Sequence, residues 1–163
     1  MVDVSEFRIE KRRAEAALTL STGATVRGFF FLAGSAASHT GPERVADLLN
    51  AETGFFPFEL NTGSEPFTAL YNRTQLVLVT LLEETVEAQL APGYSVATER
   101  AVRILLSNGR TVEGRVRVYR PVGRDRLSDY ARAPEVFRYV ESAEGTVIVN
   151  THHIVELLET TDA

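Results

Sequence analysis

The sequence predicts a mainly β protein of the α+β class, in which two tandem small β-barrel units pack together as a pseudo-dimer. Two observations lead to this prediction. Three blocks of residues in the N-terminal half recur in the same order in the C-terminal half, and each half has hairpin-forming sequences on either side of one short helical stretch. Each unit is therefore expected to follow the element order β-β-α-β-β-β.

The internal repeat is the clearest signal in the chain, because three matches in one order are not expected by chance. The matching blocks are residues 18–32 with 104–118, 44–58 with 126–140, and 68–79 with 146–157. Matching residues lie progressively closer together along the chain, so the second unit is shorter in two loops, where changes of length are tolerated. We therefore expect a first unit, a connecting segment and a second unit, at residues 1–82, 83–100 and 101–163.

Each unit is expected to begin with two strands joined by a tight turn. In the second unit the turn contains Asn108-Gly109, which is typical of a two-residue hairpin. A third strand follows the helix in each unit, at residues 55–60 and 136–140. The last two strands are expected to form another hairpin around an asparagine, which is Asn72 or Asn150.

One short helix is expected between the second and third strands of each unit. The residues from Thr40 to Glu43 have the spacing of a capping box. In the second unit Asp125 is the expected N-cap, and Pro134 is expected to end the helix near Ala133. A unit of about sixty residues buries only a thin core by itself, so the two units are expected to pack on each other.

The composition is that of an ordinary globular protein, with 44% hydrophobic and 24% charged residues. The apolar runs are too short to span a bilayer, and the first residues lack the apolar core of a secretion signal. The chain has no cysteine, which excludes disulfides, thiolate metal sites and cysteine nucleophiles. A cytoplasmic location without membrane contact is expected, and a net charge of −5 argues against a protein that coats nucleic acid.

The final hairpin VIVNTHHIVEL, at residues 147–157, resembles that of the small barrels of the Sm-like superfamily, in which a polar tip is followed by an Ile-Val pair. The segment beginning RLSDY, at residues 126–130, also looks like an uncharacterised family of small bacterial proteins with an R-L-S-D-[FY] signature. These resemblances cover about sixty residues per unit, closely in the second and loosely in the first. They imply small β-barrels, and Sm-like proteins often form rings and bind RNA.

No set of residues in the sequence predicts a catalytic or metal site. His152 and His153 are adjacent, and adjacent side chains of a strand point to opposite faces, so they are not expected to share a metal ion. Asp47 and Asp129 occupy matching helix positions, where they could act as paired carboxylates or interact with the helix dipole. We favour the structural role, and expect neither an enzyme nor a cofactor.

Two groups of residues are candidates for binding. A cluster of arginines in the second unit suits an anion or an acidic partner, because guanidinium groups form paired hydrogen bonds with phosphate and carboxylate. This arginine cluster consists of Arg115, Arg117, Arg120, Arg124 and Arg126. The first unit has more aromatic residues than a small core needs, so Phe29, Phe31 and Phe56 are candidates for an interface between units or between chains.

The function predicted from these features is a non-catalytic binding or assembly module. Its expected partner is another protein or a further copy of the chain. The alternative is recognition of an anion, a nucleotide or RNA through the arginine cluster.

Overall fold

The computed structural model describes residues 11–34, 41–60, 63, 65–82, 93–119, 123 and 126–161. The first half, residues 11–82, contains β1 (Lys11–Leu20), β2 (Thr25–Ala33), α1 (Val45–Ala51), β3 (Phe55–Leu60), β4 (Phe67–Asn72), the 3-10 turn η2 (Arg73–Gln75) and β5 (Leu76–Leu81). The second half, residues 93–161, contains η4 (Tyr94–Val96), β6 (Thr98–Leu106), β7 (Thr111–Val118), α2 (Leu127–Arg132), β8 (Phe137–Ser142), β9 (Gly145–Asn150), η5 (Thr151–His153) and β10 (Ile154–Glu159). Among these elements, no helix has the length and apolar character needed to cross a membrane.

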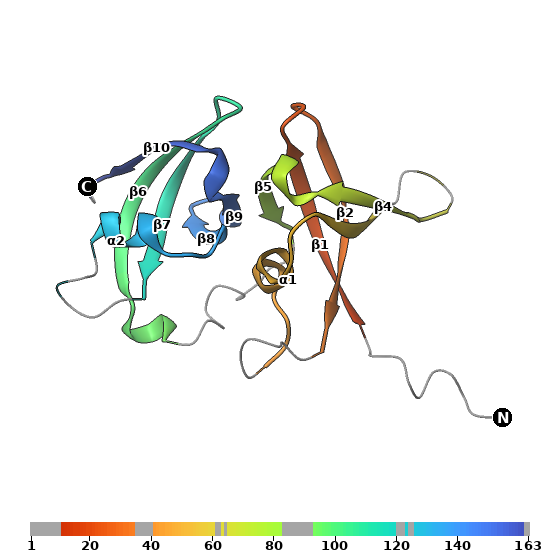
Figure 1. The fold of residues 1–163 in the computed structure, drawn as a ribbon, viewed down its shortest axis with the longest axis horizontal. Helices are drawn as coiled ribbons and strands as arrows, with labels where there is room; N and C mark the ends of the chain where they lie inside the picture. Colours follow the sequence, from red (N-terminus) through yellow and green to blue (C-terminus); the bar gives the residue numbers. More distant parts are fainter. Residues whose placement is uncertain are drawn as a thin grey trace.

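The strands form one ten-stranded antiparallel sheet in the order β10-β6-β7-β8-β9-β5-β1-β2-β3-β4 (Figure 1). The expectation of a mainly β protein is confirmed, but the expectation of two tandem Sm-like barrels is wrong. The pairing of β5 with β9 contradicts two separate barrels. Here Leu78, Val79 and Thr80 pair with Val149, Ile148 and Val147. Because these strands satisfy each other's backbone groups, the ladder continues from one half into the other instead of closing within each half.

Two hydrophobic cores lie along this single sheet, and the two strands at its middle contribute to both. In β5, Val79 belongs to the core of the first half and Leu78 to that of the second. In β9, Ile148 belongs to the first core and Val149 to the second. Successive side chains point to opposite faces, so both faces of these strands are covered. Burial on both faces explains their continuous apolar runs, LVLV and VIV.

A glycine in each half allows neighbouring strands to approach closely. A side chain at Gly28 would overlap the backbone carbonyl of Glu59, and one at Gly114 would overlap that of Glu141. These glycines lie where β2 meets β3 and where β7 meets β8, each over only two paired positions. The strands therefore cross at these points instead of running alongside each other, and the sheet bends around each core.

The first hairpin and the last 3-10 turn of each half are joined in the same way. The backbone N–H of Ser21 donates to the carbonyl of Gln75 at 2.8 Å, and that of Ser107 donates to the carbonyl of His153 at 2.8 Å. The elements also follow one another in the same order in both halves. Matching residues of the sequence blocks can therefore be compared directly as structural positions.

Each α-helix begins at an arginine whose backbone is held by an aspartate three residues later. The carboxylate of Asp47 accepts a hydrogen bond from the backbone N–H of Arg44 at 2.8 Å, and Asp129 does the same for Arg126 at 3.0 Å. This role agrees with the structural interpretation of the two aspartates. The caps expected from the sequence, Thr40 and Asp125, lie outside the described residues. Both expectations are wrong, because the N-caps are Arg44 and Arg126, and the aspartate three residues later holds each helix start.

Candidate functional site

The pairing of β5 with β9, together with the packing of α1 on β8, forms the closed joint between the halves (Figure 1). At its end lies Asn150, whose side chain is almost completely buried. Its amide nitrogen donates to the carbonyl oxygens of Leu76 at 2.9 Å and Arg73 at 3.3 Å, both in the first half. Its amide oxygen accepts from the backbone N–H of His152 at 2.9 Å. One buried side chain thus holds its own turn and also binds the opposite half.

His153 adds a second polar contact across the closed joint. Its Nε2 lies 2.7 Å from the carbonyl oxygen of Thr74 in the first half. Its Nδ1 lies 2.7 Å from the hydroxyl of Ser107 in its own half. A neutral imidazole that donates through Nε2 accepts through Nδ1, so one tautomer satisfies both contacts. The histidine therefore links two turns, one in each half.

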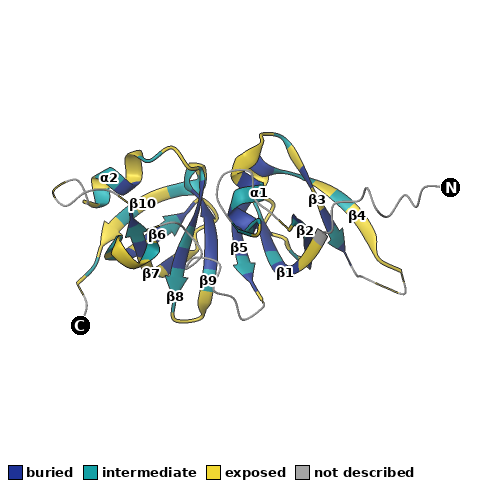
Figure 2. Cartoon of the chain, turned by 90° about the horizontal axis from the view of Figure 1, so that it is seen from below, coloured by how far each residue is buried: buried dark blue, intermediate teal, exposed yellow. Residues whose placement is uncertain are grey.

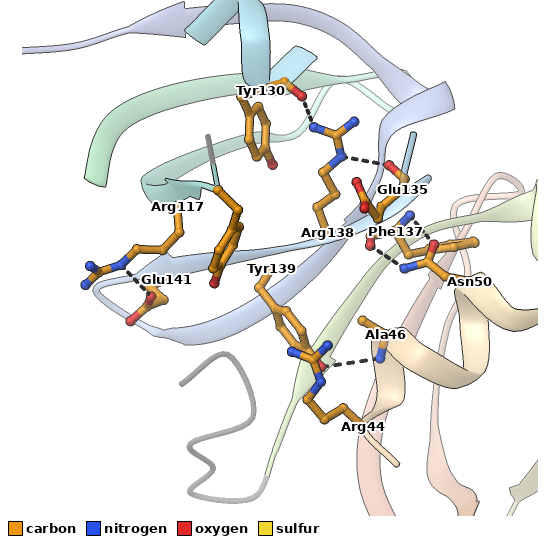
Figure 3. A pocket seen from close by; sticks show the side chains of 11 residues that line it. Arg44, Ala46, Asn50, Arg117, Tyr130, Glu135, Phe137, Arg138, Tyr139 and Glu141 are labelled. Atoms are coloured by element: carbon orange, nitrogen blue, oxygen red, sulfur yellow. Dashed lines mark hydrogen bonds and ion pairs between the residues drawn. The ribbon is translucent and has the colours of Figure 1, made fainter. Parts of the chain in front are cut away.

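Helix α1 fastens the closed joint from one side (Figure 3). The side chain of Asn50 accepts from the backbone N–H of Phe137 and donates to its carbonyl, both at 2.9 Å. The hydroxyl of Tyr139 accepts from the backbone N–H of Ala46 at 3.4 Å. The guanidinium of Arg44 lies 5.4 Å from the centre of the Tyr139 ring. These contacts reach from the first half onto β8 of the second.

A cavity of about 240 Å³ lies beside these contacts and is lined by residues of both halves (Figure 3). Its walls combine aromatic residues, among them Tyr119, Tyr130 and Tyr139, with charged arginine and glutamate side chains. The hydroxyl of Tyr130 is buried and meets no partner with hydrogen-bond geometry among the described residues. Burial raises the pKa of Tyr130 to about 12, although the nearby guanidinium of Arg138 opposes the shift. Tyr130 is therefore a neutral phenol at physiological pH.

The cationic groups around this cavity, Arg44, Arg117 and Arg138, lie in ion pairs or hydrogen bonds, although Nε of Arg117 is buried and makes no hydrogen bond in the described part of the chain. Arg44 pairs with Asp47 at 2.8 Å. The three guanidinium nitrogens of Arg138 donate to backbone carbonyls of Tyr130, Ala133 and Glu135. The cavity consequently offers the rings and hydroxyls of three tyrosines among charged groups that are already engaged, and its geometry does not favour binding of an anion.

The structure places two residues of the arginine cluster against carboxylates. Arg115 lies 2.9 Å from Glu99. Arg117 lies 3.5 Å from Glu99 and 3.8 Å from Glu141, and its guanidinium is 4.1 Å from the centre of the Tyr94 ring. Both arginines lie on β7, and the glutamates that pair with them lie on the neighbouring strands β6 and β8. The acidic groups therefore balance the charge of these two arginines.

The remaining members of the arginine cluster are not brought together in the described part of the chain. Arg126 is exposed at the start of α2. Arg120 and Arg124 lie outside the described residues. Anion or nucleotide recognition by this cluster stays a prediction from the sequence.

The three phenylalanines expected at an interface occupy different environments. Phe56 is fully buried in the first core, with its ring centre 5.6 Å from that of Phe30. Phe29 is half-buried beneath the guanidinium of Arg13, at 4.3 Å from the ring centre. Phe31 is also half-buried. Phe56 therefore serves the core.

Strands β4 and β10 are the two edges of the sheet, and we call them the open ends. Phe55 of β3 lies beside β4 and is included with that end. Within the described residues, β4 pairs only with β3 and β10 pairs only with β6. Large apolar side chains are exposed at both ends: Phe55 by 60%, Leu70 by 66% and Val155 by 65%. Figure 2 shows the contrast between the exposed strand β4 and the buried pair β5 and β9 in the middle of the molecule.

Each of these exposed residues matches a buried residue at the closed joint. Leu70 matches Ile148, Phe55 matches Phe137, and Val155 matches Val77 in the sequence blocks. The exposed fractions of these matching residues are 0% for Ile148, 4% for Phe137 and 0% for Val77. The apolar side chains that hold the two halves together thus have counterparts at the ends that face solvent.

The sequence analysis did not identify the open ends, although the sequence contains a signal for them. The strand at β5 reads LVLV and is apolar on both faces, whereas the matching residues 154–157 of β10 read IVEL and include Glu156. A strand covered on both faces has a continuous apolar run, and a charge interrupts this pattern where one face is open. Comparison of the matching strands for charge would have distinguished the middle strand from the end strand.

Among the residues that the structure describes, no group of three or more histidine, aspartate or glutamate side chains is placed to hold a metal ion. Comparisons with protein families, with curated proteins and with solved structures gave no match to this chain. The resemblance to Sm-like proteins is therefore an expectation without a test, and the function has to be argued from the geometry of the closed joint and the open ends.

Proposed function

We propose that this protein is a non-catalytic assembly module that associates with further copies of itself through the open ends of its sheet. One observation carries the proposal: three apolar residues exposed at the open ends match residues buried at the closed joint. The chain thus contains one example of the contact that its open ends are suited to make.

Open sheet edges are suited to association because they combine unpaired backbone groups with apolar side chains. An edge strand presents a row of N–H and C=O groups that a further strand can satisfy. Burial of one large apolar side chain contributes about 1.5–3 kcal/mol. Association costs about 4–15 kcal/mol in lost freedom of motion, so a few such side chains with a short ladder support a weak, reversible contact.

The non-catalytic part of the proposal is supported by the roles of the polar side chains that could have done chemistry. Asp47 and Asp129 hold the starts of α1 and α2. His153 links two turns through both ring nitrogens. These groups are engaged with backbone or with neighbouring side chains, in arrangements that stabilise turns and helix ends.

The test is the mass of the full chain in solution, measured by sedimentation equilibrium over about a hundredfold range of concentration. The mass of the unmodified protein is expected to rise with concentration. Leu70→Lys puts a charge into the contact and should weaken association by at least about tenfold. Val96→Lys is the matched control, because Val96 is 86% exposed and lies in η4, outside β4 and β10.

The control should associate like the unmodified protein. A mass equal to one chain at every concentration would overturn the proposed function. Equal association of the Leu70→Lys variant and the unmodified protein would show that the contact lies elsewhere on the molecule, which would also overturn it.

A further inference from the structure

We infer that β10 of one copy pairs with β4 of the next copy, antiparallel and in the register of the closed joint. This inference rests on the proposed function and specifies which edges meet. It makes the assembly polar, with each copy offering one edge of each kind.

The identity of the two edges follows from the strand order. The closed joint joins β5, the last strand of the first half, to β9, the fourth strand of the second half. The fourth strand of the first half is β4, and the last strand of the second half is β10. The open ends are therefore the same two kinds of strand that the closed joint already joins.

The register at the new contact can be read from the matching residues. At the closed joint Leu78 lies opposite Val149, Val79 opposite Ile148, and Thr80 opposite Val147. The sequence blocks match β5 with β10 and β9 with β4. The resulting pairs between two copies are Glu156 opposite Tyr71, Leu157 opposite Leu70, and Leu158 opposite Ala69.

The apolar residues of both edges support this arrangement. Ile148 reaches from β9 into the core of the first half, and Val77 reaches from β5 into that of the second. Leu70 and Val155 stand at these two positions on the open ends, where they are more than half exposed. Leu158, on the same strand as Val155, is 43% exposed. Pairing in this register covers apolar surface on both copies at once.

The polar residue that fastens the closed joint also has a counterpart. Asn72 matches Asn150, and its amide oxygen accepts from the backbone N–H of Thr74 at 3.0 Å, as that of Asn150 does from His152. In the proposed contact the amide nitrogen of Asn72 takes the place of that of Asn150. It then donates to the backbone carbonyls of the next copy, at Thr151 and Ile154.

The link made by His153 has a counterpart in Gln75. The side-chain oxygen of Gln75 accepts a hydrogen bond from the hydroxyl of Ser21, just as Nδ1 of His153 contacts the hydroxyl of Ser107. His153 uses its other nitrogen to reach the opposite half. The amide nitrogen of Gln75 is the matching group at the open end; it donates to the hydroxyl of Thr74 at 3.3 Å and has a second N–H that can donate to a backbone carbonyl of the next copy.

Two replacements make the contact between copies weaker than the closed joint. Glu156 stands where Leu78 is buried, so a carboxylate enters the contact opposite Tyr71. Charged residues on an edge strand oppose strand addition. Arg132 replaces Asn50, whose paired hydrogen bonds fasten Phe137. The contact between copies is therefore reversible, whereas the closed joint belongs to the folded chain.

The arrangement predicts how the assembly grows. Pairing of like edges, such as β4 with β4, gives a two-fold dimer that has no further open edge of that kind. Pairing of β10 with β4 leaves one edge of each kind open after every addition. The assembly is therefore expected to exceed two copies unless its ends meet.

Cysteine cross-linking tests the register directly, because the chain has no cysteine of its own. Opposite residues of an antiparallel pair are close enough for a disulfide. Two single-cysteine proteins, Ala69→Cys and Leu158→Cys, are mixed under mild oxidation, and cross-linked product is measured by non-reducing electrophoresis. The matched control replaces Ala69→Cys by Phe67→Cys, a partly exposed position two residues away on the same strand.

The mixture of Ala69→Cys and Leu158→Cys should form cross-linked dimers at least about tenfold faster than the control mixture or either protein alone. Faster cross-linking of Ala69→Cys with itself would overturn the inference and leave the proposed function standing, because like edges would then pair. Failure of the unmodified protein to associate at all would overturn both.

A second variant tests the same register without cysteine. Glu156→Leu restores the residue that β5 carries at this position, and should tighten association by at least about tenfold. The control is Glu144→Leu, an exposed position in the turn between β8 and β9, which should change association little. Unchanged or weaker association of the Glu156→Leu variant would overturn the register.

Discussion

The closed joint and the open ends are built from matching residues in opposite environments. At the closed joint, strands β5 and β9 are buried on both faces, and Asn150 and His153 bond across the contact. At the open ends, the matching strands β10 and β4 have one neighbour each among the described residues, and their apolar residues face solvent. The same kind of sequence thus acts as core in one place and as available surface in the other.

This comparison shows that burial here depends on which strand is adjacent. Leu70 and Ile148 are both large aliphatic residues in matching strands, yet one is 66% exposed and the other is completely buried. What differs is the neighbouring β5, which covers Ile148 and has no counterpart beside β4 in the described residues. Substitutions at matched positions can therefore measure what the added neighbour contributes.

The largest expected difference in the free energy of unfolding is between the variants Ile148→Ala and Leu70→Ala. Removing a fully buried isoleucine side chain costs about 2–5 kcal/mol, because contacts are lost and a cavity remains. The substitution Leu70→Ala, at the matching exposed position, is expected to alter the free energy of unfolding by less than about 0.5 kcal/mol. Urea denaturation at low protein concentration, where copies are separate, measures both. Similar losses at the two positions would contradict the different burial of these strands.

The next pair is Asn150→Ala and Asn72→Ala. Asn150→Ala removes two buried hydrogen bonds and a partly buried one, and leaves carbonyls of the first half without this donor. We expect a loss of about 2–4 kcal/mol, since each unsatisfied buried group costs about 1–3 kcal/mol. Asn72→Ala removes the cap of η2 and should cost about 1 kcal/mol. Denaturation curves with equal losses would show that Asn150 contributes only as a cap.

A pH-dependent prediction concerns Tyr130, which matches Leu48 in the first half. Its pKa is about 12 in the folded protein and ordinarily 10.0, so the folded state holds the proton more tightly. The resulting stability is complete below pH 10 and is lost as the pH rises through 12, by about 2–3 kcal/mol. Tyr130→Phe should remove this part of the alkaline loss.

The measurement for Tyr130 is the free energy of unfolding of both proteins between pH 7 and pH 12. At pH 7 the variant should be as stable as the unmodified protein or slightly more stable, because the buried hydroxyl makes no hydrogen bond within the part of the chain that the structure describes. Parallel pH profiles for the two proteins would contradict the shifted titration of Tyr130.

The smallest expected effect compares the two helix starts. Arg44 lies at the closed joint, with its side chain only 11% exposed, between Asp47 and the ring of Tyr139. Arg44→Ala leaves a largely buried carboxylate without its partner and should cost about 1–3 kcal/mol. Arg126→Ala, at the exposed start of α2, should cost less than about 0.5 kcal/mol. A loss at Arg126 as large as that at Arg44 in thermal or urea denaturation would contradict the difference.

Local features of the fold could be predicted from the sequence because their signals are local. The turn glycines marked the hairpins, and strands β3 and β8 lie at or within two residues of their predicted positions. Helix α2 ends at Arg132, next to the predicted end at Ala133. Each of these depends on a few neighbouring residues, such as a glycine in a turn or a proline after a helix.

Of the candidate site, the charge at Glu156 marks β10 as an end strand in the sequence, but its other features could not be predicted in this way. Exposure of Leu70 and burial of Ile148 do not follow from their residue types, and the Arg–Asp pair of α1 is more buried than a surface pair. The buried Arg138 was also missed, because its role depends on three carbonyls around the end of α2. These features depend on contacts between segments far apart in the chain.

The sequence by itself determined the order of strands and helices and the positions of the tight turns, because backbone preferences and short-range hydrogen bonds act within a few residues. Only the tertiary structure decided that β5 and β9 join the halves into one sheet while β4 and β10 lie at its ends. Any antiparallel edge can satisfy the backbone of another, so strand pairing is chosen by which apolar faces can be covered together.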